Sequence, residues 1–323
     1  MHATPARLPR LLAILPLACS AACAGARSSG DTPPAALSLV PASADRLFAV
    51  GGFEIPESVR HDPRRDRYFV SNVGRGETAK DNNGYISRLL PDGTVEARRF
   101  IAGGERGVVL HAPKGLYVSG DTLWATDIDA VRAFDARTGA PLASVDLSPL
   151  GARFLNDVAA GPDGSLYVSD SGLEFHPDGR VTHPGPDRVF RVRPDLRPEV
   201  AFDADSVRVP NGVAWDPAGG GRLIVASFSG SRPGLYAWRP GAAARAEQIA
   251  AGPGEYDGVE AIGGGRLIVS SQRDSAVHLV DRGVFTRLAG GLPNVGDIGL
   301  DRTRNRLLVP LLEAGRVEVW QLR

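Results

Sequence analysis

The chain repeats one pattern six times between about residue 45 and residue 323. Each copy begins with small polar residues and an apolar strand. It continues through a turn rich in Pro, Asp and Gly to a second apolar strand that ends in small polar residues. The clearest copy is FLNDVAAGPDGSLYVSDSG, at 154–172, and the others lie at 55–74, 112–129, 209–230, 256–274 and 295–315. Such repetition predicts an assembly of similar sheets.

The residue that begins each copy, here called its start residue, gives the spacing of the units. In chain order the start residues are Glu57, Lys114, Asn156, Asn211, Asp257 and Asp297. They are 40 to 57 positions apart, and the segment 45–323 allows about 46 residues per unit, close to one four-stranded propeller blade. Segments such as RVFRV and RVEVW alternate with period 2, without sustained helical periodicity. The sequence therefore predicts an all-β, six-bladed β-propeller, because a sandwich or open barrel does not explain the fixed period.

The two ends of the repeat region are complementary. The last copy stops after RVEVWQLR, one strand short of a blade, and the spare strand DRLFAV at 45–50 precedes the first start residue. Pairing the two closes the ring and removes an exposed sheet edge. We expect the propeller to span 45–323 and to be closed by its N-terminal strand.

The first residues carry the pattern of an export signal. Arginines at 7 and 10 precede the apolar run 11–18, and small residues follow, so 1–24 is predicted to be a signal peptide and 25–44 a flexible tether. The apolar run is shorter than the roughly 20 residues that span a bilayer. The stretch LPLAC resembles a bacterial lipoprotein cleavage box, with Cys19 or Cys23 as the lipidated residue; plain cleavage near Ala24 or Ala26, giving a soluble exported protein, is the alternative.

Composition limits the partners of the chain. The 37 basic and 37 acidic residues cancel, so no net charge attracts nucleic acid or an acidic membrane. We expect an exported protein of a bacterium, periplasmic or attached to the outer membrane only through an N-terminal lipid. The expected partner is a small-molecule substrate, and the oligomeric state is left open.

Start residues from different blades converge on one mouth of the central channel, because the innermost strands of a propeller run beside it. Four of them supply hard oxygen donors: Glu57, Asn156, Asn211 and Asp257. Two carboxylates and two amides, with waters completing the shell, form a ligand set for a divalent cation, calcium foremost. The absence of a convergent cysteine or histidine set disfavours zinc. Asp297 is predicted to be a cap or turn residue.

The same four segments resemble a known family. IPES with Glu57, LNDVAAGPDG with Asn156, PNGVAWDP with Asn211 and YDGVEAIGGGRLIVSS with Asp257 are similar to the metal-binding segments of the SMP-30/gluconolactonase/LRE-like family. The resemblance covers 45–323 and implies a six-bladed propeller with one divalent ion, commonly calcium, and often lactone or ester hydrolysis. It implies that the residues matching Glu57, Asn211 and Asp257 ligate the metal. The one matching Asn156 ligates it or lies beside the substrate.

Other residues depart from the family's pattern. The sugar-lactone enzymes carry an arginine where this chain has Phe154, which disfavours a gluconate-like substrate. Lys114 begins the second blade, and its ammonium is expected to hold a substrate carboxylate or to stabilise developing negative charge. His111, in HAPKG, is expected beside the same mouth as a further substrate-binding residue. Asp257 is predicted to share the catalytic role with Lys114, by orienting water or transferring a proton.

Three function classes remain open. The first is a calcium-dependent hydrolase of a lactone or other ester. The second is a non-catalytic propeller that binds a ligand or protein and uses the metal only for stability. The third is a metal-independent enzyme of the strictosidine-synthase kind. Two inserts, 74–87 and 172–188, either cover the channel and select ligands or form surface loops. Family resemblance favours the hydrolase, although one propeller supports many functions.

Overall fold

The computed structural model describes residues 1, 36–176, 178–241 and 245–323. The chain divides into two units, Met1–Gly30 and Asp31–Arg323, and every described strand belongs to the second. The predicted signal peptide, both cysteines and most of the predicted tether lie outside the described residues. None of the helices within the described ranges is long and apolar enough to cross a membrane.

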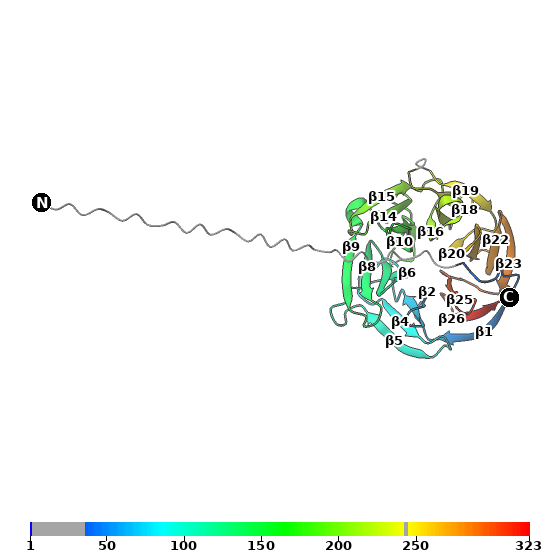
Figure 1. Ribbon diagram of the computed structural model, residues 1–323, viewed down its shortest axis with the longest axis horizontal. Helices are drawn as coiled ribbons and strands as arrows, with labels where there is room; N and C mark the ends of the chain where they lie inside the picture. The colour runs from blue at the N-terminus through cyan, green and yellow to red at the C-terminus, as the bar shows by residue number, and fades with distance from the viewer. Residues whose placement is uncertain (2–35, 177, 242–244) are drawn as a thin grey trace. The chain divides into compact units, whose positions relative to one another are not determined.

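Over the described part of the chain, the second unit folds into six antiparallel four-stranded sheets arranged as the blades of a propeller (Figure 1). Blade 1 contains β2 (Pro56–Asp62), β3 (Arg67–Asn72), β4 (Tyr85–Leu89) and β5 (Val95–Ala102). Blade 2 contains β6 (Pro113–Ser119), β7 (Thr122–Asp127), β8 (Ala130–Asp135) and β9 (Pro141–Asp146). Blade 3 contains β10 (Leu155–Ala160), β11 (Leu166–Asp170), β14 (Arg188–Val192) and β15 (Pro198–Asp203).

The other three blades follow the same order from the channel outwards. Blade 4 contains β16 (Pro210–Asp216), β17 (Arg222–Ser227), β18 (Gly234–Trp238) and β19 (Glu247–Ala251). Blade 5 contains β20 (Tyr256–Gly263), β21 (Arg266–Ser271), β22 (Ala276–Asp281) and β23 (Val284–Gly290). Blade 6 contains β24 (Gly299–Asp301), β25 (Arg306–Leu311), β26 (Arg316–Leu322) and, outermost, β1 (Ala44–Gly51). A separate hairpin, β12 (Glu174–Phe175) with β13 (Val181–Thr182), and two 3-10 turns, Ser148–Leu150 and Ala218–Gly220, complete the described elements.

The ring closes as the sequence predicts. Strand β1 pairs antiparallel with β26, from Ala44 opposite Leu322 to Gly51 opposite Arg316, so blade 6 contains both ends of the propeller. Ahead of β1, Leu37 is buried in the core next to blades 5 and 6, and its N–H donates to the Ile262 carbonyl at 3.3 Å. The last described residues of the predicted tether therefore pack on the propeller.

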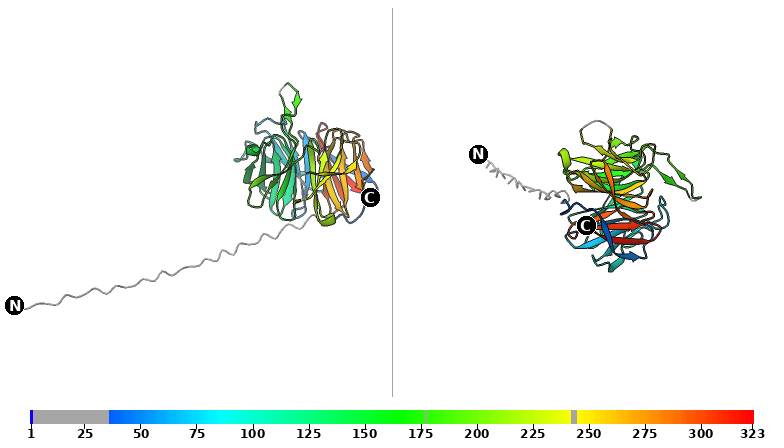
Figure 2. Two further views of the ribbon diagram at one scale, coloured as in Figure 1. Left: turned by 90° about the horizontal axis from the view of Figure 1, so that it is seen from above. Right: turned by 90° about the vertical axis from the view of Figure 1, so that its right-hand side faces the viewer.

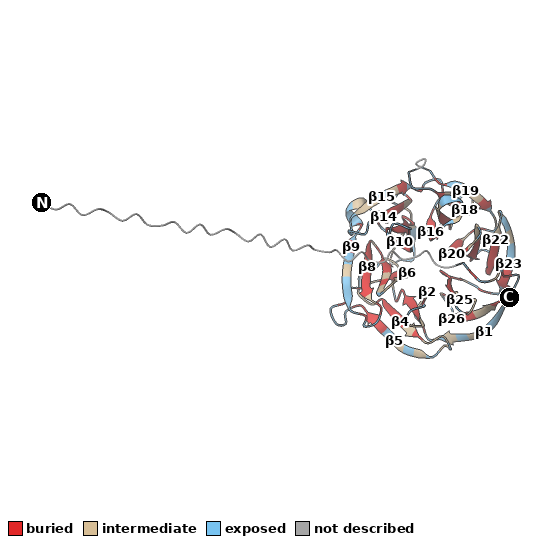
Figure 3. Ribbon diagram, in the orientation of Figure 1, coloured by how far each residue is buried: buried red, intermediate tan, exposed pale blue. Residues whose placement is uncertain are grey.

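The core lies between neighbouring blades. The inner strands of each blade are covered on both faces and are almost continuously buried, whereas the outermost strands face water and are largely exposed (Figure 3). Between blades 1 and 2, for example, Phe69 and Ile86 pack with Leu116 and Phe134 in one buried cluster. This packing fixes the inner strands around the channel and so determines where their first residues lie.

Candidate metal centre

A bulge marks the start residue in blades 1 to 5. In blade 1 the pairing of β2 with β3 shifts register between Pro56 and Val59, which leaves Glu57 and Ser58 outside the regular ladder. The same shift occurs at the start residue in blades 2, 3, 4 and 5. A bulge re-aims side chains locally, so it turns these residues out of the sheet and towards the channel.

Hydroxyl groups from the second strand satisfy the backbone at the bulge. Ser71, Ser169 and Ser270 accept hydrogen bonds from the second bulge residue of blades 1, 3 and 5, at 2.9, 3.0 and 2.8 Å. Ser169 also donates to the carbonyl of Asn211 in the next blade, at 2.5 Å. Thr126 of blade 2 donates likewise to the carbonyl of Asn156, at 2.6 Å. The small polar residues that end each repeat thus fix the start residues of neighbouring blades.

The four predicted ligands share one property. Glu57, Asn156 and Asn211 are each 5% exposed and Asp257 is 4% exposed. Within the described ranges, each presents one buried oxygen without a hydrogen-bond partner: Glu57 Oε2, Asn156 Oδ1, Asn211 Oδ1 and Asp257 Oδ1. A buried polar atom without a partner costs stability, and such atoms in a native protein need an explanation such as an ion.

The remaining polar atoms of these side chains hold them in place. Asn156 Nδ2 donates to Ser171 Oγ at 3.3 Å, and Gln272 Nε2 donates to Asp257 Oδ2 at 2.9 Å. The nearby side chain of Asn211 lowers the pKa of Asp257 and so acts on the same carboxyl group. In Asn156 and Asp257 the anchoring contact is made by the atom opposite the unpartnered oxygen, so one atom is held in place and the other is left for a ligand.

Burial and mutual repulsion perturb both carboxyl groups. Burial raises the pKa of Glu57 well above its ordinary value, and the negative charges of Asp257 and Asp297 raise it further. Burial likewise raises the pKa of Asp257, and Asp297 again adds to the effect. The electrostatic coupling between Glu57 and Asp257 means that blades 1 and 5 bring these groups into one environment. No ion pair to either carboxylate occurs among the described residues.

Lys114 and His111 have partners on the first insert. Lys114 Nζ donates to the Glu77 carbonyl at 3.0 Å, and the side chain is 2% exposed. Its positive charge lowers the pKa of Glu57, so Lys114 faces the same environment. His111 Nδ1 accepts from the Asn82 N–H at 3.0 Å, and no contact between its ring and the four ligands occurs among the described residues. The predicted catalytic and substrate-binding roles of these two residues stay predictions.

Comparison with known proteins identifies the family. The model of a region described as SMP-30/Gluconolactonase/LRE-like matches residues 64–232, more than half of the chain. The chain belongs to this family. No curated protein sequence matches this family member significantly.

Solved structures similar to this SMP-30/gluconolactonase/LRE-like protein share its fold at low identity. XC5397 from Xanthomonas campestris, described as a gluconolactonase important in glucose secondary metabolic pathways, is 18% identical with a TM-score of 0.64, covering 90% of this chain and 98% of that one. A second structure, provisionally assigned as a gluconolactonase, is 21% identical with a TM-score of 0.65, covering 89% and 94%. Virginiamycin B lyase from Staphylococcus aureus is 10% identical with a TM-score of 0.56, covering 87% and 99%.

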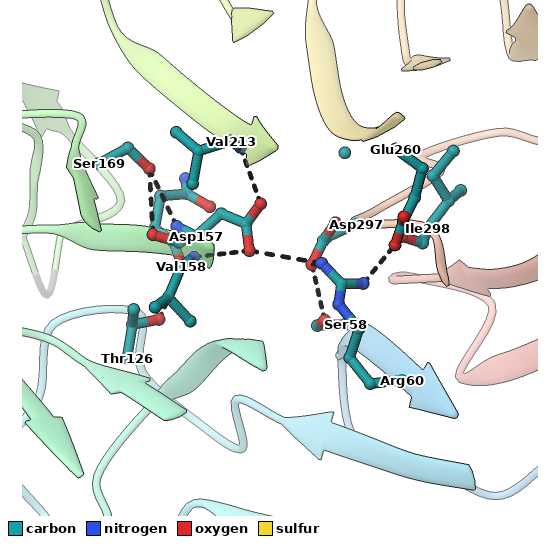
Figure 4. Close-up of polar contacts among 12 residues, drawn as sticks. Ser58, Arg60, Thr126, Asp157, Val158, Ser169, Val213, Glu260, Asp297 and Ile298 are labelled. Carbon is teal, nitrogen blue, oxygen red and sulfur yellow. Dashed lines mark hydrogen bonds and ion pairs between the residues drawn. The ribbon is translucent and has the colours of Figure 1, made fainter. Parts of the chain in front are cut away.

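A second layer of charged groups lies in the channel of this family member (Figure 4). Arg60 of blade 1 donates to Asp297 Oδ2 at 2.7 Å and to Asp157 Oδ1 at 3.4 Å, and both carboxylates are fully buried. Asp297 also accepts from Ser58 Oγ at 2.6 Å, so it is a channel residue and the prediction of a cap or turn is wrong. Asp157 directly follows the start residue Asn156, and Arg60 lies three positions after Glu57; sequence reasoning identified neither as a channel residue.

Glycine allows this close packing at two places. A Cβ on Gly115 would lie 2.5 Å from Asp157 Cα, and a Cβ on Gly258 would lie 2.5 Å from Asp297 Oδ1. Each glycine directly follows a start residue. A side chain there would push the next blade away from the channel.

The donor set fits a hard divalent cation better than a soft one. No group of three or more His, Cys, Asp or Glu side chains placed to hold a metal occurs in the part of the chain that the structure describes. The candidate set instead combines two carboxylates with two amides, all of them oxygen donors, as calcium prefers. Glu57, Asp157, Asp257 and Asp297 bring four carboxylates into the channel, where Arg60 pairs with Asp157 and Asp297 and Lys114 is paired with Glu77. Acidic groups therefore outnumber basic ones around the candidate site, and a bound divalent cation would offset the excess negative charge.

Proposed function

We propose that this chain is an exported hydrolase of a lactone or other ester and that it uses one divalent cation, calcium foremost. The unpartnered oxygens of four buried side chains, Glu57, Asn156, Asn211 and Asp257, carry the proposal. Membership of the SMP-30/gluconolactonase/LRE-like family supports the ester chemistry. The fold shared with the Xanthomonas campestris protein, whose name gives it as a gluconolactonase, supports it further.

The four side chains would hold the cation, and Asp257 would also handle a proton. A divalent cation bound there supplies Lewis acidity towards the carbonyl oxygen of the substrate. Gln272 anchors Asp257 through Oδ2, which leaves Oδ1 as the ligand oxygen; in that position the carboxylate would also orient the attacking water and accept its proton. Glu57 contributes charge and a ligand oxygen. Burial excludes bulk water from these groups and strengthens each electrostatic contact.

Export is proposed from the signal pattern of the first 24 residues, with the mature protein periplasmic or attached to the outer membrane through Cys19 or Cys23. Cell fractionation of the wild type and of a Cys19→Ser, Cys23→Ser double variant tests both parts. A soluble periplasmic double variant beside a membrane-bound wild type supports lipid attachment. Retention of both in the cytoplasm contradicts export.

The function is tested by measuring hydrolysis of a lactone panel with calcium and after chelation. We expect chelation to abolish turnover reversibly. Glu57→Gln, which keeps the shape but removes a ligand charge, should lower turnover by at least about 100-fold. The matched control is Glu247→Gln, on the exposed outer strand of blade 4, which should behave as wild type.

Two results would contradict the proposal. Tight calcium binding by calorimetry without turnover of any lactone or ester would identify a non-catalytic binding propeller. Full turnover by the metal-free protein would identify a metal-independent enzyme of the strictosidine-synthase kind.

A further inference from the structure

Both inserts rise from the face that carries the start residues. Each inner strand begins at the channel mouth, so its antiparallel neighbour ends there. The first insert connects the end of β3 to β4, and the second connects the end of β11 to β14. The left view of Figure 2 shows the green β12–β13 hairpin of the second insert projecting beyond one face of the propeller.

The first insert is tied down onto blade 2. Asn82 accepts from the Leu110 N–H at 2.8 Å and donates its own N–H to His111 at 3.0 Å. Lys80 pairs with Asp129 at 2.5 Å. The insert therefore lies across the start of blade 2, and His111 serves as one of its attachment points.

Lys114 sits beneath the same insert with its charge engaged. Besides the Glu77 carbonyl at 3.0 Å, Nζ lies 3.5 Å from Glu77 Oε2 and 3.4 Å from the Ala112 carbonyl. It also lies 4.2 Å from the centre of the Phe154 ring, in a cation–π contact. All three N–H donors of the ammonium thus have acceptors nearby, and two of these acceptors belong to Glu77.

The circle of contacts is completed by the second insert. Phe154 stacks on Phe175 with ring centres 5.2 Å apart, and Thr78 Oγ1 donates to the Phe175 carbonyl at 3.1 Å. Lys114, Glu77, Thr78, Phe175 and Phe154 therefore form a closed chain of contacts, here called the cover. The cover lies beside the mouth. The charge of Glu77 raises the pKa of Asp257, and the charge of Lys114 lowers the pKa of Glu57.

We propose that Lys114 is a positioning residue that clamps the cover over one side of the mouth, and that the clamped cover restricts the substrate to a small lactone. The inference rests on the proposed hydrolase function. A cover of this kind excludes water and must open for substrates to pass. It also gives Lys114, the start residue of blade 2, a role in substrate selection.

The test compares two lactones of equal ring size, δ-valerolactone and δ-dodecalactone, which differ only in an alkyl tail. The variants Thr78→Val and Phe175→Leu break the cover without changing any charge at the mouth, and Lys114→Met removes the clamp. We expect all three to raise the ratio of kcat/KM for the long lactone to that for the short one by about tenfold. Thr286→Val, exposed on the outer strand of blade 5, is the matched control and should leave the ratio unchanged.

Limited trypsin digestion provides a readout that does not depend on turnover. Arg75 and Lys80 are exposed on the first insert. Loss of one hydrogen bond should increase cleavage there by about three- to tenfold, because cleavage follows the population of the open insert. Thr78→Val and Lys114→Met should both show this increase.

One combination of results would overturn the clamp. If Lys114→Met loses kcat equally for both lactones and is cleaved by trypsin at the wild-type rate, while Thr78→Val has the wild-type lactone ratio and cleavage, then Lys114 acts in charge stabilisation. If the wild type hydrolyses no lactone, the proposed function fails. The trypsin result then decides alone whether the clamp exists.

Discussion

At the scale of single residues, Arg60 explains how acidic groups can be buried in the channel. Burial by itself lowers the pKa of Arg60, yet the attraction of Asp297 and Asp157 raises it above its ordinary value. The guanidinium is therefore charged and compensates one of the two fully buried carboxylates. Breaking a buried pair by removing one partner is far more costly than replacing both.

Replacing this arginine should destabilise the protein strongly. Arg60→Met leaves Asp157 and Asp297 buried without a cation, so we expect the free energy of unfolding to fall by about 3–5 kcal/mol in urea titrations. Arg282→Met is the control, because Arg282 is 91% exposed and should change stability little. Equal stability of the two variants would show that the channel pair contributes nothing.

At the scale of elements, the turn between β2 and β3 is joined to the turn between β24 and β25. Asp66 accepts from Arg304 at 2.8 and 2.6 Å, and Arg304 also contacts the buried Asp301 of its own turn. The hydrogen bonds from Arg304 lower the pKa of Asp66 from 3.8 to about 2. This ion pair connects blade 1 to blade 6, the blade in which the ring closes.

The joint should make stability depend on pH in the acid range. A carboxyl group whose pKa is lowered by folding stabilises the fold above its ordinary pKa, and this contribution is lost as pH falls from about 4 to about 2. Asp66→Asn should therefore lower the free energy of unfolding at pH 6 by less than about 1 kcal/mol, because the group is half exposed, and should match wild type near pH 2. Asp205→Asn, an exposed position, is the control. A difference that persists unchanged at pH 2 would contradict the ion-pair account.

The elements themselves are more predictable than the contacts between them. The repeat predicts six blades, the closing strand and the start residues, because each depends on position within a unit. The roles of Asp157, Arg60 and Glu77 could not be predicted in this way. They depend on which side chains meet across the channel or beneath an insert, and the curvature that brings them together is not encoded in any local sequence pattern. The serines that end each repeat were visible in the sequence, but their role in fixing the next blade required the register of the bulge.

At the scale of the whole molecule, one cation bound among four blades couples ligand binding to the stability of the ring. Glu57, Asn156, Asn211 and Asp257 come from blades 1, 3, 4 and 5. Unfolding separates them, so the unfolded chain has no site and the cation stabilises only the native state. Stability should therefore report how many ions bind.

A single site predicts a definite slope. Above the Kd, each tenfold rise in free calcium should raise the free energy of unfolding by about 1.4 kcal/mol. Chemical unfolding across a series of calcium buffers measures the slope, and Glu57→Gln should flatten it. Twice that slope in the wild type would reveal a second ion and contradict the one-cation proposal.

The charged layer formed by Arg60, Asp157 and Asp297 has a consequence for traffic. These side chains come from blades 1, 3 and 6 and contact one another across the channel, so we expect them to block passage through the ring. Substrate that enters from the start-residue face would then have to leave as product through the same face. Because product occupies the route that the next substrate needs, we expect accumulated product to inhibit turnover competitively.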